Sequence, residues 1–247
     1  MSRSKRLSRV YFPGEVTAHG LVDLPPEPSH HIAHVLRLVP GEGVVAFDGR
    51  GNEYDAVIER VSKSAVTLRM GDPRPVDRES PLQVTLAQGI SSGERMDYTV
   101  QKAVELGVHA IQPLLTERSV VRLHSERAAK RVAHWHSIAI AACEQCGRNR
   151  VPEVHPIASF VAWLGTPKTD SVRLTLAPEA PMRLLDMERV AQPVVLLVGP
   201  EGGLAPRERE DAVAAGFTAA RLGPRVLRTE TAAVAALAAL QTLWGDF

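Results

Sequence analysis

The chain has 247 residues, of which 45% are hydrophobic and 23% are charged, and its formal net charge is only +1. Domains commonly hold about 100 to 200 residues, so this length predicts one large or two modest domains. No apolar run approaches the roughly 18 residues that span a bilayer, and the start MSRSKRLSRV lacks the apolar core of a secretory signal. We therefore expect a cytoplasmic protein with no membrane partner, in which any surface for nucleic acid is local.

The amino-terminal segment MSRSKRLSRVYF is the first such basic surface. Arg6 and Arg9 can neutralise phosphates, and the aromatic residues Tyr11 and Phe12 can stack on a base. The alternative is a solvated chain end that binds nothing.

Residues 18–70 show mostly strand patterns with Gly-rich turns, which is typical of a small β-barrel. The expected strands cover residues 44–47, 54–58 and 64–70, and a strong turn signal lies at residues 48–52. A short helix is expected over residues 29–38, where Arg37 is a candidate phosphate contact. The three histidines of that helix have no carboxylate or cysteine beside them, so we predict no metal site.

The segment GDPRPVDRESP, residues 71–81, has three prolines among charged residues. Such a composition is typical of a stiff and exposed connector. We therefore expect a first domain over residues 1–72, a linker over residues 73–81 and a second domain over residues 82–247.

The second domain alternates strand and helix patterns, which predicts an α/β fold with a parallel sheet. Strands are expected at residues 82–88, 110–115, 172–176, 194–198 and 219–222, and helices at residues 96–106 and 125–146 and after Thr229. The long helix ends beside Gly147, so Gln145, Arg148 and Asn149 can project into a site. Its Cys143 and Cys146 form a single C-x-x-C without a second pair, so we predict a structural role for them.

Two turns carry the strongest functional signal. The strands at residues 194–198 and 219–222 each stop at a Gly-Pro pair, and parallel strands that end side by side form a ligand crevice. The first turn reads GPEGGL, which lacks the Lys-Ser/Thr of a phosphate loop and the spacing of a dinucleotide fingerprint. A pocket lined by backbone, with little fixed positive charge, suits a ligand such as adenosine that has no phosphates. The alternative is a pair of ordinary strand-to-helix turns.

The segments LLVGPEGG, residues 196–203, and LGPRVLRTETA, residues 222–232, resemble the bacterial family of 16S ribosomal RNA uridine-N3 methyltransferases. VQKAVELG, TERS and IAACEQCGRN, residues 100–107, 116–119 and 140–149, extend the resemblance, as do His30, His31 and residues 35–37. This family belongs to the SPOUT methyltransferases. The resemblance implies a trefoil-knotted, parallel-sheet methyltransferase domain and a smaller amino-terminal PUA-like RNA-binding β-barrel.

The resemblance also implies S-adenosylmethionine as methyl donor, a uridine of 16S rRNA in the small ribosomal subunit as acceptor, and a homodimer. The expected cofactor-binding residues lie in the strand-end loops: Leu176, Val198, Gly199, Gly202, Gly203, Leu222, Gly223, Leu227, Thr229 and Ala232. The candidate catalytic residues are Arg148, Glu201, Arg225 and Arg228, of which Glu201 is a candidate base and the arginines can stabilise an anion. The candidate RNA contacts are Arg6, Arg9, Arg37, Arg95, Gln145 and Asn149.

Three other functions stay open at this point. A non-catalytic RNA-binding module would need the basic amino end but no organised glycine loops. A small-molecule α/β enzyme would need the loops but no affinity for RNA. A related methyltransferase could also act on another RNA nucleotide.

Overall fold

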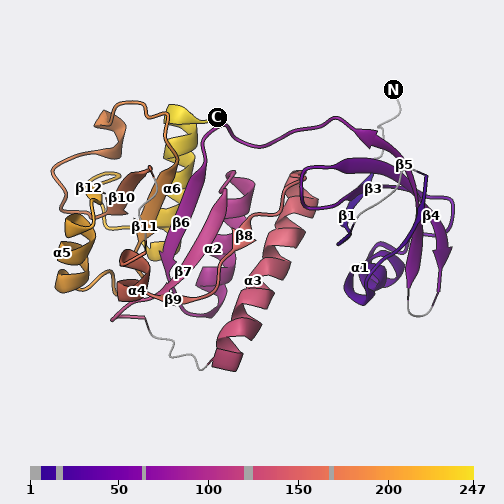
Figure 1. The fold of residues 1–247 in the computed structure, drawn as a ribbon, viewed down its shortest axis with the longest axis horizontal. Helices are drawn as coiled ribbons and strands as arrows, with labels where there is room; N and C mark the ends of the chain where they lie inside the picture. Colours follow the sequence, from indigo (N-terminus) through magenta and orange to yellow (C-terminus); the bar gives the residue numbers. More distant parts are fainter. Residues whose placement is uncertain (1–6, 15–18, 63–64, 120–124, 167–169) are drawn as a thin grey trace. The chain divides into compact units, whose positions relative to one another are not determined.

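The computed structural model describes residues 7–14, 19–62, 65–119, 125–166 and 170–247, so Arg6 lies outside the described residues. The chain forms two compact units (Figure 1). Unit 1 comprises Met1–Glu79 with Cys143–Val151, and unit 2 comprises Ser80–Ala142 with Pro152–Phe247. Across the described ranges, no helix is both long enough and apolar enough to cross a membrane.

A five-stranded sheet forms the body of unit 1, in the order β1-β3-β4-β5-β2. Its strands are β1 (Ser8–Tyr11), β2 (Leu21–Asp23), β3 (Gly43–Phe47), β4 (Glu53–Val61) and β5 (Val66–Arg74). β1 pairs with β3 in parallel, and the other pairs are antiparallel. At the predicted turn between β3 and β4, the Asp48 carboxylate accepts hydrogen bonds from the backbone N–H groups of Arg50 and Asn52. The strands predicted in this part of the chain are confirmed.

The helix predicted over residues 29–38 consists of two short pieces, α1 (Pro26–His30) and the π-helical turn η1 (His31–Leu36). Ile32 is fully buried in the core of unit 1. The helical path ends at Arg37, which takes a left-handed conformation with φ of 54°. Arg37 is exposed.

Buried charges hold Cys143–Val151 in unit 1. Glu53 is completely buried, and its carboxylate pairs with Arg9 at 2.5 Å and with Arg74 and Arg78 at 3.1 Å. Arg9 also donates to the side-chain oxygen of Asn149 at 2.6 Å. Burial raises the pKa of Glu53, but the hydrogen bonds and charges of Arg9 and Arg78 outweigh it and leave this pKa below its ordinary value. The predicted domain boundaries did not include this return of residues 143–151 to the first unit.

Unit 2 is built on a seven-stranded parallel sheet with the order β12-β10-β11-β6-β7-β8, in which β9 also pairs with β7. Its strands are β6 (Val84–Gly89), β7 (Ala110–Leu115), β8 (Glu153–Val154), β9 (Ala158–Ser159), β10 (Val172–Leu176), β11 (Val194–Val198) and β12 (Thr218–Ala220). The fold class predicted from the sequence, an α/β parallel-sheet domain with a smaller β domain before it, is confirmed.

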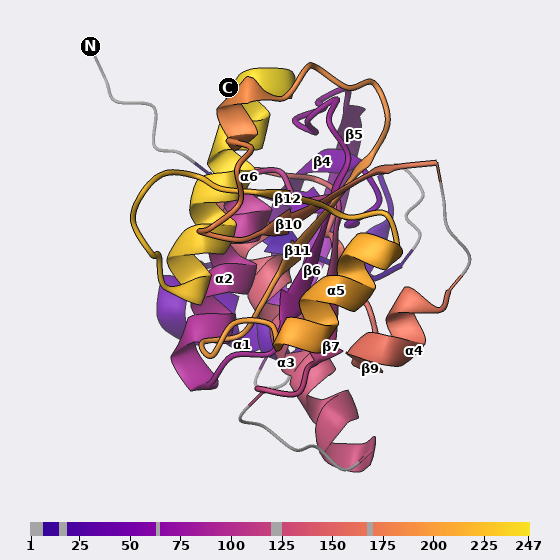
Figure 2. The same ribbon diagram turned by 90° about the vertical axis from the view of Figure 1, so that its left-hand side faces the viewer.

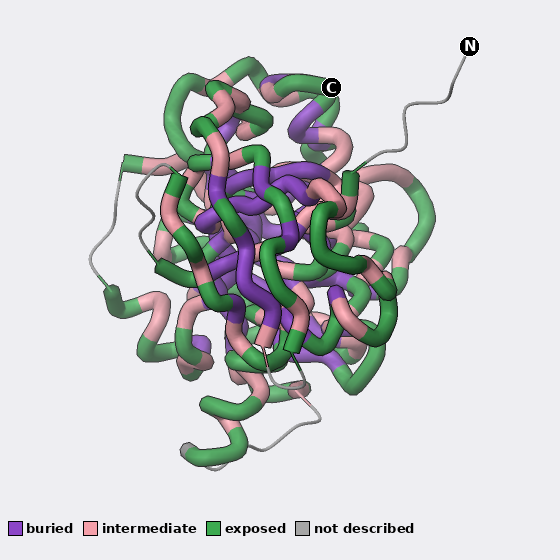
Figure 3. Tube along the Cα trace, turned by 90° about the vertical axis from the view of Figure 1, so that its right-hand side faces the viewer, coloured by how far each residue is buried: buried purple, intermediate pink, exposed green. Residues whose placement is uncertain are grey.

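Helices cover both faces of this sheet. They are α2 (Gly93–Glu105), α3 (Ser125–Cys146), α4 (Phe160–Leu164), α5 (Pro206–Ala214) and α6 (Thr229–Trp244), with a 3-10 turn η2 (Leu184–Asp186). Figure 2 shows α2 and α6 on one face and α4 and α5 on the other. The central strands β6 and β11 are buried along most of their length, as expected for parallel strands covered on both faces. Figure 3 draws the buried stretches of the chain in purple.

Two details differ from the sequence prediction. β5 continues to Arg74, beyond the predicted start of the linker, because Arg74 still pairs with Glu53 of β4. Helix α6 begins at Thr229 itself, whereas it was expected after this residue, and no side chain caps it. The Thr229 hydroxyl donates instead to the carbonyl oxygen of Gly199 at 2.6 Å.

We expect Glu53→Gln to lower the free energy of unfolding by about 3 kcal/mol, because it leaves the shielded guanidinium of Arg9 without its counter-charge. The lowered pKa of Glu53 means that the unfolded chain binds this proton more readily, so its stabilisation is present above the unfolded pKa and is lost as the pH falls through the folded pKa. Denaturant titrations followed by circular dichroism between pH 7 and pH 3 measure both effects.

Glu59→Gln is the matched control, because Glu59 lies on the same strand in an exposed pair with Arg69. It should change the free energy of unfolding by less than about 1 kcal/mol. An equal loss in both variants, or an unchanged acid limb in Glu53→Gln, would contradict this account of the buried charge cluster.

Candidate functional site

The loops after β10, β11 and β12 line one pocket of about 290 Å³ at the carboxyl edge of the sheet. All ten residues predicted to bind the cofactor belong to its lining: Leu176, Val198, Gly199, Gly202, Gly203, Leu222, Gly223, Leu227, Thr229 and Ala232. Two of the predicted catalytic residues, Glu201 and Arg225, line it as well. The pocket therefore brings together residues that the sequence separates by up to 56 positions, from Leu176 to Ala232.

The glycine loop after β11 is tight because its backbone packs against itself. A Cβ atom on Gly199 would lie 2.8 Å from the backbone nitrogen of Leu204, and Gly203 has a φ of +66°. A Cβ atom on Gly89, at the end of β6, would lie 2.6 Å from the ring of Pro200. Only glycine fits these places, so the loop can follow the ligand pocket closely.

Polar side chains tie this loop to its neighbours. The amide nitrogen of Gln88 lies 3.0 Å from the hydroxyl oxygen of Thr229 and 3.3 Å from the carbonyl oxygen of Gly199, and it donates to both. The Thr229 hydroxyl in turn donates to the same carbonyl oxygen. Gln88 is completely buried, so this contact is shielded from water. The ends of β6 and β11 and the start of α6 are thereby joined.

Glu201 is held by the loop before α2. Its Oε1 accepts hydrogen bonds from the backbone N–H and the hydroxyl of Ser92, both at 2.7 Å, and from Arg95 at 3.1 Å. Burial raises the pKa of Glu201, but the hydrogen bonds from Ser92 and Arg95 outweigh it and lower this pKa. Glu201 is therefore an ionised anchor and a weak base, and Arg95, a predicted RNA contact, is its partner.

The loop after β7 supports the glycine loop from the other side of β6. Arg118 donates to the carbonyl oxygen of Gly202 at 2.8 Å. Glu208 accepts hydrogen bonds from the backbone N–H groups of Glu117 and Ala205. Sequence reasoning assigned no role to Gln88, Ser92 or Arg118. The signal for Gln88 was its polar amide near the end of the strand VTLAQG, in which Thr85 is the other polar residue.

Arg225 and Arg228, in the loop between β12 and α6, occupy different positions relative to the pocket. Arg225 lines the pocket, whereas Arg228 occupies the cap position before α6 and is not among the lining residues. Both are exposed. Neither guanidinium has an ion-pair partner among the described residues, so both are free to meet an incoming anion.

The predicted functional residues of unit 1 fall into two groups. Arg148 and Asn149 are buried, the side chain of Arg9 is 7% exposed, and the guanidinium of Arg148 pairs with Glu79. Burial lowers the pKa of Arg148, but Glu79 outweighs it and raises this pKa. Their placement favours structural roles over the predicted RNA-binding and catalytic roles, because their charges and amide are already bonded inside unit 1. Arg37 and Gln145 are exposed.

Cys143 and Cys146 are both free thiols. Burial raises the pKa of the Cys143 thiol to about 12, so this thiol stays protonated at neutral pH. A protonated thiol is a poor nucleophile and a poor metal ligand. Across the described ranges, no three His, Cys, Asp or Glu side chains gather as metal ligands.

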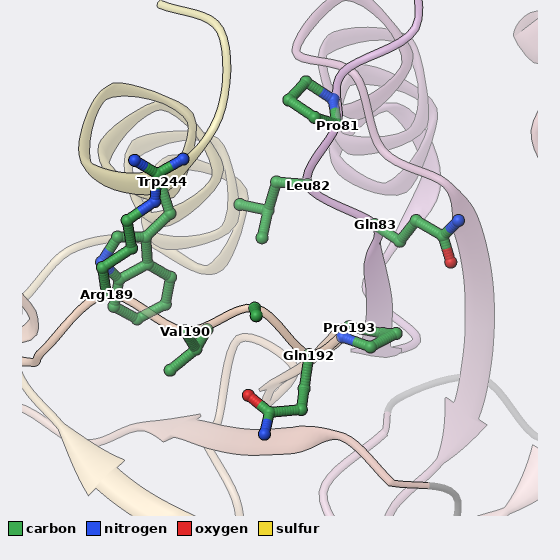
Figure 4. Close-up of a pocket in the computed structure, with 9 residues that line it drawn as sticks. Pro81, Leu82, Gln83, Arg189, Val190, Gln192, Pro193 and Trp244 are labelled. Carbon is green, nitrogen blue, oxygen red and sulfur yellow. The ribbon is translucent and has the colours of Figure 1, made fainter.

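A second cavity, of about 610 Å³, lies at the amino ends of β6 and β11. Figure 4 shows Leu82, Val190 and Trp244 around it, with Gln83 and Pro193 on the segments that enter the two strands. Ligands of parallel α/β sheets bind at the carboxyl ends of the strands. The smaller pocket at the glycine loops is therefore the candidate active site, despite the larger volume of this cavity.

Comparison with known proteins shows the family of this chain. The model of an RNA methyltransferase domain matches residues 78–241, and that of an RNA methyltransferase PUA domain matches residues 24–70. Ribosomal RNA small subunit methyltransferase E of Buchnera aphidicola is 32% identical over 98% of this chain and 98% of its own. The Bacillus subtilis protein of the same name is 33% identical over 87% of both chains. The chain belongs to this methyltransferase family.

Solved structures of relatives cover the whole fold. Ribosomal RNA small subunit methyltransferase E of Neisseria gonorrhoeae, crystallised with S-adenosylmethionine, has a TM-score of 0.91 and 44% identity over 98% of this chain and 100% of its own. A Legionella pneumophila protein crystallised with the same cofactor has a TM-score of 0.94 and 43% identity over the same shares. The family resemblance seen in the sequence motifs is thereby confirmed.

We expect Gly89→Ala to destabilise the protein by about 1 to 3 kcal/mol, because the added methyl group collides with Pro200 and must push the two loops apart. Gly165→Ala is the control, since a Cβ there would meet only ordinary contacts of 3.5 Å or more. Denaturant titration of both variants measures the difference. Equal stability of the two variants would contradict the close packing described for this loop.

Proposed function

We propose that the protein transfers a methyl group from S-adenosylmethionine to N3 of a uridine in the 16S rRNA of the small ribosomal subunit. The observation that carries this proposal is the pocket at the carboxyl ends of β10, β11 and β12, whose lining contains every residue predicted to bind the cofactor. Relatives crystallised with S-adenosylmethionine support the choice of donor. The relatives from Buchnera aphidicola and Bacillus subtilis, both named ribosomal RNA small subunit methyltransferase E, support small-subunit rRNA as the acceptor.

The pocket fits an adenosine-bearing donor. Leu176, Leu222 and Leu227 supply apolar surface for a flat base, and the glycine loop brings backbone groups to the ligand without side chains between them. The donor supplies an electrophilic methyl group on a sulfonium. The protein must hold that methyl group in line with the acceptor nitrogen, and proximity then provides much of the rate.

Uridine N3 carries a proton that must leave during the reaction. The negative charge that develops spreads over the base carbonyl oxygens, and Arg225 and Arg228 can stabilise it because both guanidinium groups are exposed and free of ion pairs among the described residues. Glu201 is poorly suited as the base, since its pKa is lowered and one oxygen is already bonded to Ser92 and Arg95.

Unit 1 would bind RNA around the target nucleotide. Its match to a PUA domain of RNA methyltransferases supports this assignment, and Arg37 and Gln145 present exposed polar side chains. We also infer a homodimer in the cytoplasm, where ribosomal subunits are made. The base must be unpaired or flipped to reach the pocket.

The deciding experiment is methyl transfer from labelled S-adenosylmethionine to small ribosomal subunits that lack the modification, followed by mass spectrometry of the labelled nucleoside. We expect N3-methyluridine at one site. Label on another nucleoside would overturn the proposed acceptor, and binding of RNA without binding of the donor would favour a non-catalytic RNA-binding module. Light scattering of the same preparation should give twice the mass of the chain, and a fully active monomer would contradict the dimer.

A further inference from the structure

Arg118 lies in the loop after β7, three residues beyond the end of the strand. Its guanidinium donates a hydrogen bond to the carbonyl oxygen of Gly202 at 2.8 Å. A Cβ atom on Gly202 would lie 3.2 Å from the Cβ of Arg118, so the stem of the arginine also packs against the glycine loop. Because Gly202 lines the pocket proposed for the methyl donor, these two contacts hold a guanidinium at the edge of that pocket.

The positive charge of Arg118 is not neutralised by any described residue. Its side chain is exposed, and none of the described carboxylates forms an ion pair with it. The carboxylate of Glu201 pairs with Arg95, and the two oxygens of Glu208 accept hydrogen bonds from backbone N–H groups. A guanidinium has five N–H donors, and the carbonyl of Gly202 uses one of them. The remaining donors are left for water or for an anion from outside the protein.

The pocket has cations on both sides along the carboxyl edge of the sheet. The strand order β12-β10-β11-β6-β7 places the loop of Arg225 at one end of this row and the loop of Arg118 at the other. The pocket lies between them, lined by the loops after β10, β11 and β12. Neighbouring strands lie about 4.8 Å apart, so β12 and β7 are separated by about 19 Å. A few nucleotides of a single RNA strand can span that distance.

The chemistry of the acceptor accounts for an exposed cation at this place. A base that enters the pocket stays joined through its ribose to phosphates that remain outside. The fork of a guanidinium binds a phosphate through two parallel hydrogen bonds. The carboxylate of the methyl donor is the other anion at this site, but Arg118 is not among the lining residues, whereas Arg209 and Arg225 are. An RNA phosphate therefore suits Arg118 better than the donor does.

We infer that Arg118 binds a phosphate of the RNA strand that carries the target nucleotide, on the side of the pocket away from Arg225; this rests on the proposed function. The hydrogen bond to Gly202 holds the guanidinium in place before the RNA arrives, so less side-chain freedom is lost on binding. The same bond ties the phosphate to the loop that lines the pocket, and the target base is thereby positioned against the donor. Arg118 contributes affinity for the RNA and not for the donor.

The test compares Arg118→Gln, which removes the charge and keeps an amide that can donate to Gly202, with Arg118→Lys, which keeps the charge. Arg189→Gln is the control, because Arg189 is an exposed arginine before β11, at the opposite edge of the same sheet. Affinity for unmodified small ribosomal subunits is measured by filter binding at fixed Mg²⁺ over a series of KCl concentrations. Affinity for S-adenosylmethionine is measured by titration calorimetry, and retained affinity verifies that each variant is folded.

We expect Arg118→Gln to bind the subunits about tenfold more weakly, because a charge-assisted contact is lost. The slope of log affinity against log salt should fall in magnitude by about 0.7 to 0.9, the value for one phosphate. Arg118→Lys should keep the wild-type slope, and Arg189→Gln should match the wild type in both affinities. Donor affinity should stay within about twofold of the wild type in all three variants.

A larger loss of donor affinity in Arg118→Gln would overturn the inference, since it would show that Arg118 supports the loop or binds the donor carboxylate. Unchanged subunit affinity and slope would overturn it as well, and label on uridine would then leave the proposed function standing. Label on another nucleoside, together with the expected loss in Arg118→Gln, would overturn the proposed acceptor and keep the phosphate contact.

Discussion

The carbonyl oxygen of Gly199 is the point on which the candidate active site depends. It accepts a hydrogen bond from Thr229 at 2.6 Å and another from Gln88 at 3.3 Å, so one backbone atom joins β11, β6 and α6. The surrounding chain is packed too closely for any side chain at Gly199 or Gly89. Removing either donor would leave the Gly199 carbonyl oxygen short of a hydrogen bond in a place that water does not reach, which costs free energy. The need to keep both hydrogen bonds therefore fixes the geometry of the loop.

Unit 1 is held together by a network of ion pairs and hydrogen bonds around Glu53. Its buried Glu53 is surrounded by arginines from three segments, and Asn149 and Arg148 bring residues 143–151 into the same network. Buried ion pairs add little stability compared with apolar residues of similar volume, but removing one partner of a buried pair lowers the stability strongly. The network therefore holds residues 143–151 in unit 1, and it uses Arg9, which the sequence predicted as an RNA contact, and Arg148, which it predicted as a catalytic residue.

The glycine loops could be predicted because their signals are local. Gly-Pro pairs at the ends of two apolar runs mark strand-end turns, and the parallel sheet brings those turns together in one pocket. The contacts of Arg9 and Arg148 inside unit 1 could not be predicted, because an arginine looks the same in sequence whether it meets a phosphate or a glutamate. Gln88 was missed for a similar reason, since its contacts with Thr229 and Gly199 join segments that lie far apart in the sequence.

We infer that the polar contact at Gly199 shapes the pocket proposed for the methyl donor. The most direct measurement is the affinity for S-adenosylmethionine, by titration calorimetry, of Thr229→Val, which keeps the shape of the side chain but removes its hydroxyl. Thr242→Val is the control, because the Thr242 hydroxyl bonds only a carbonyl of its own helix. The account predicts at least about tenfold weaker binding for Thr229→Val, the equivalent of about 1.4 kcal/mol, and unchanged binding for the control. Equal affinity of both variants and the wild type would contradict it.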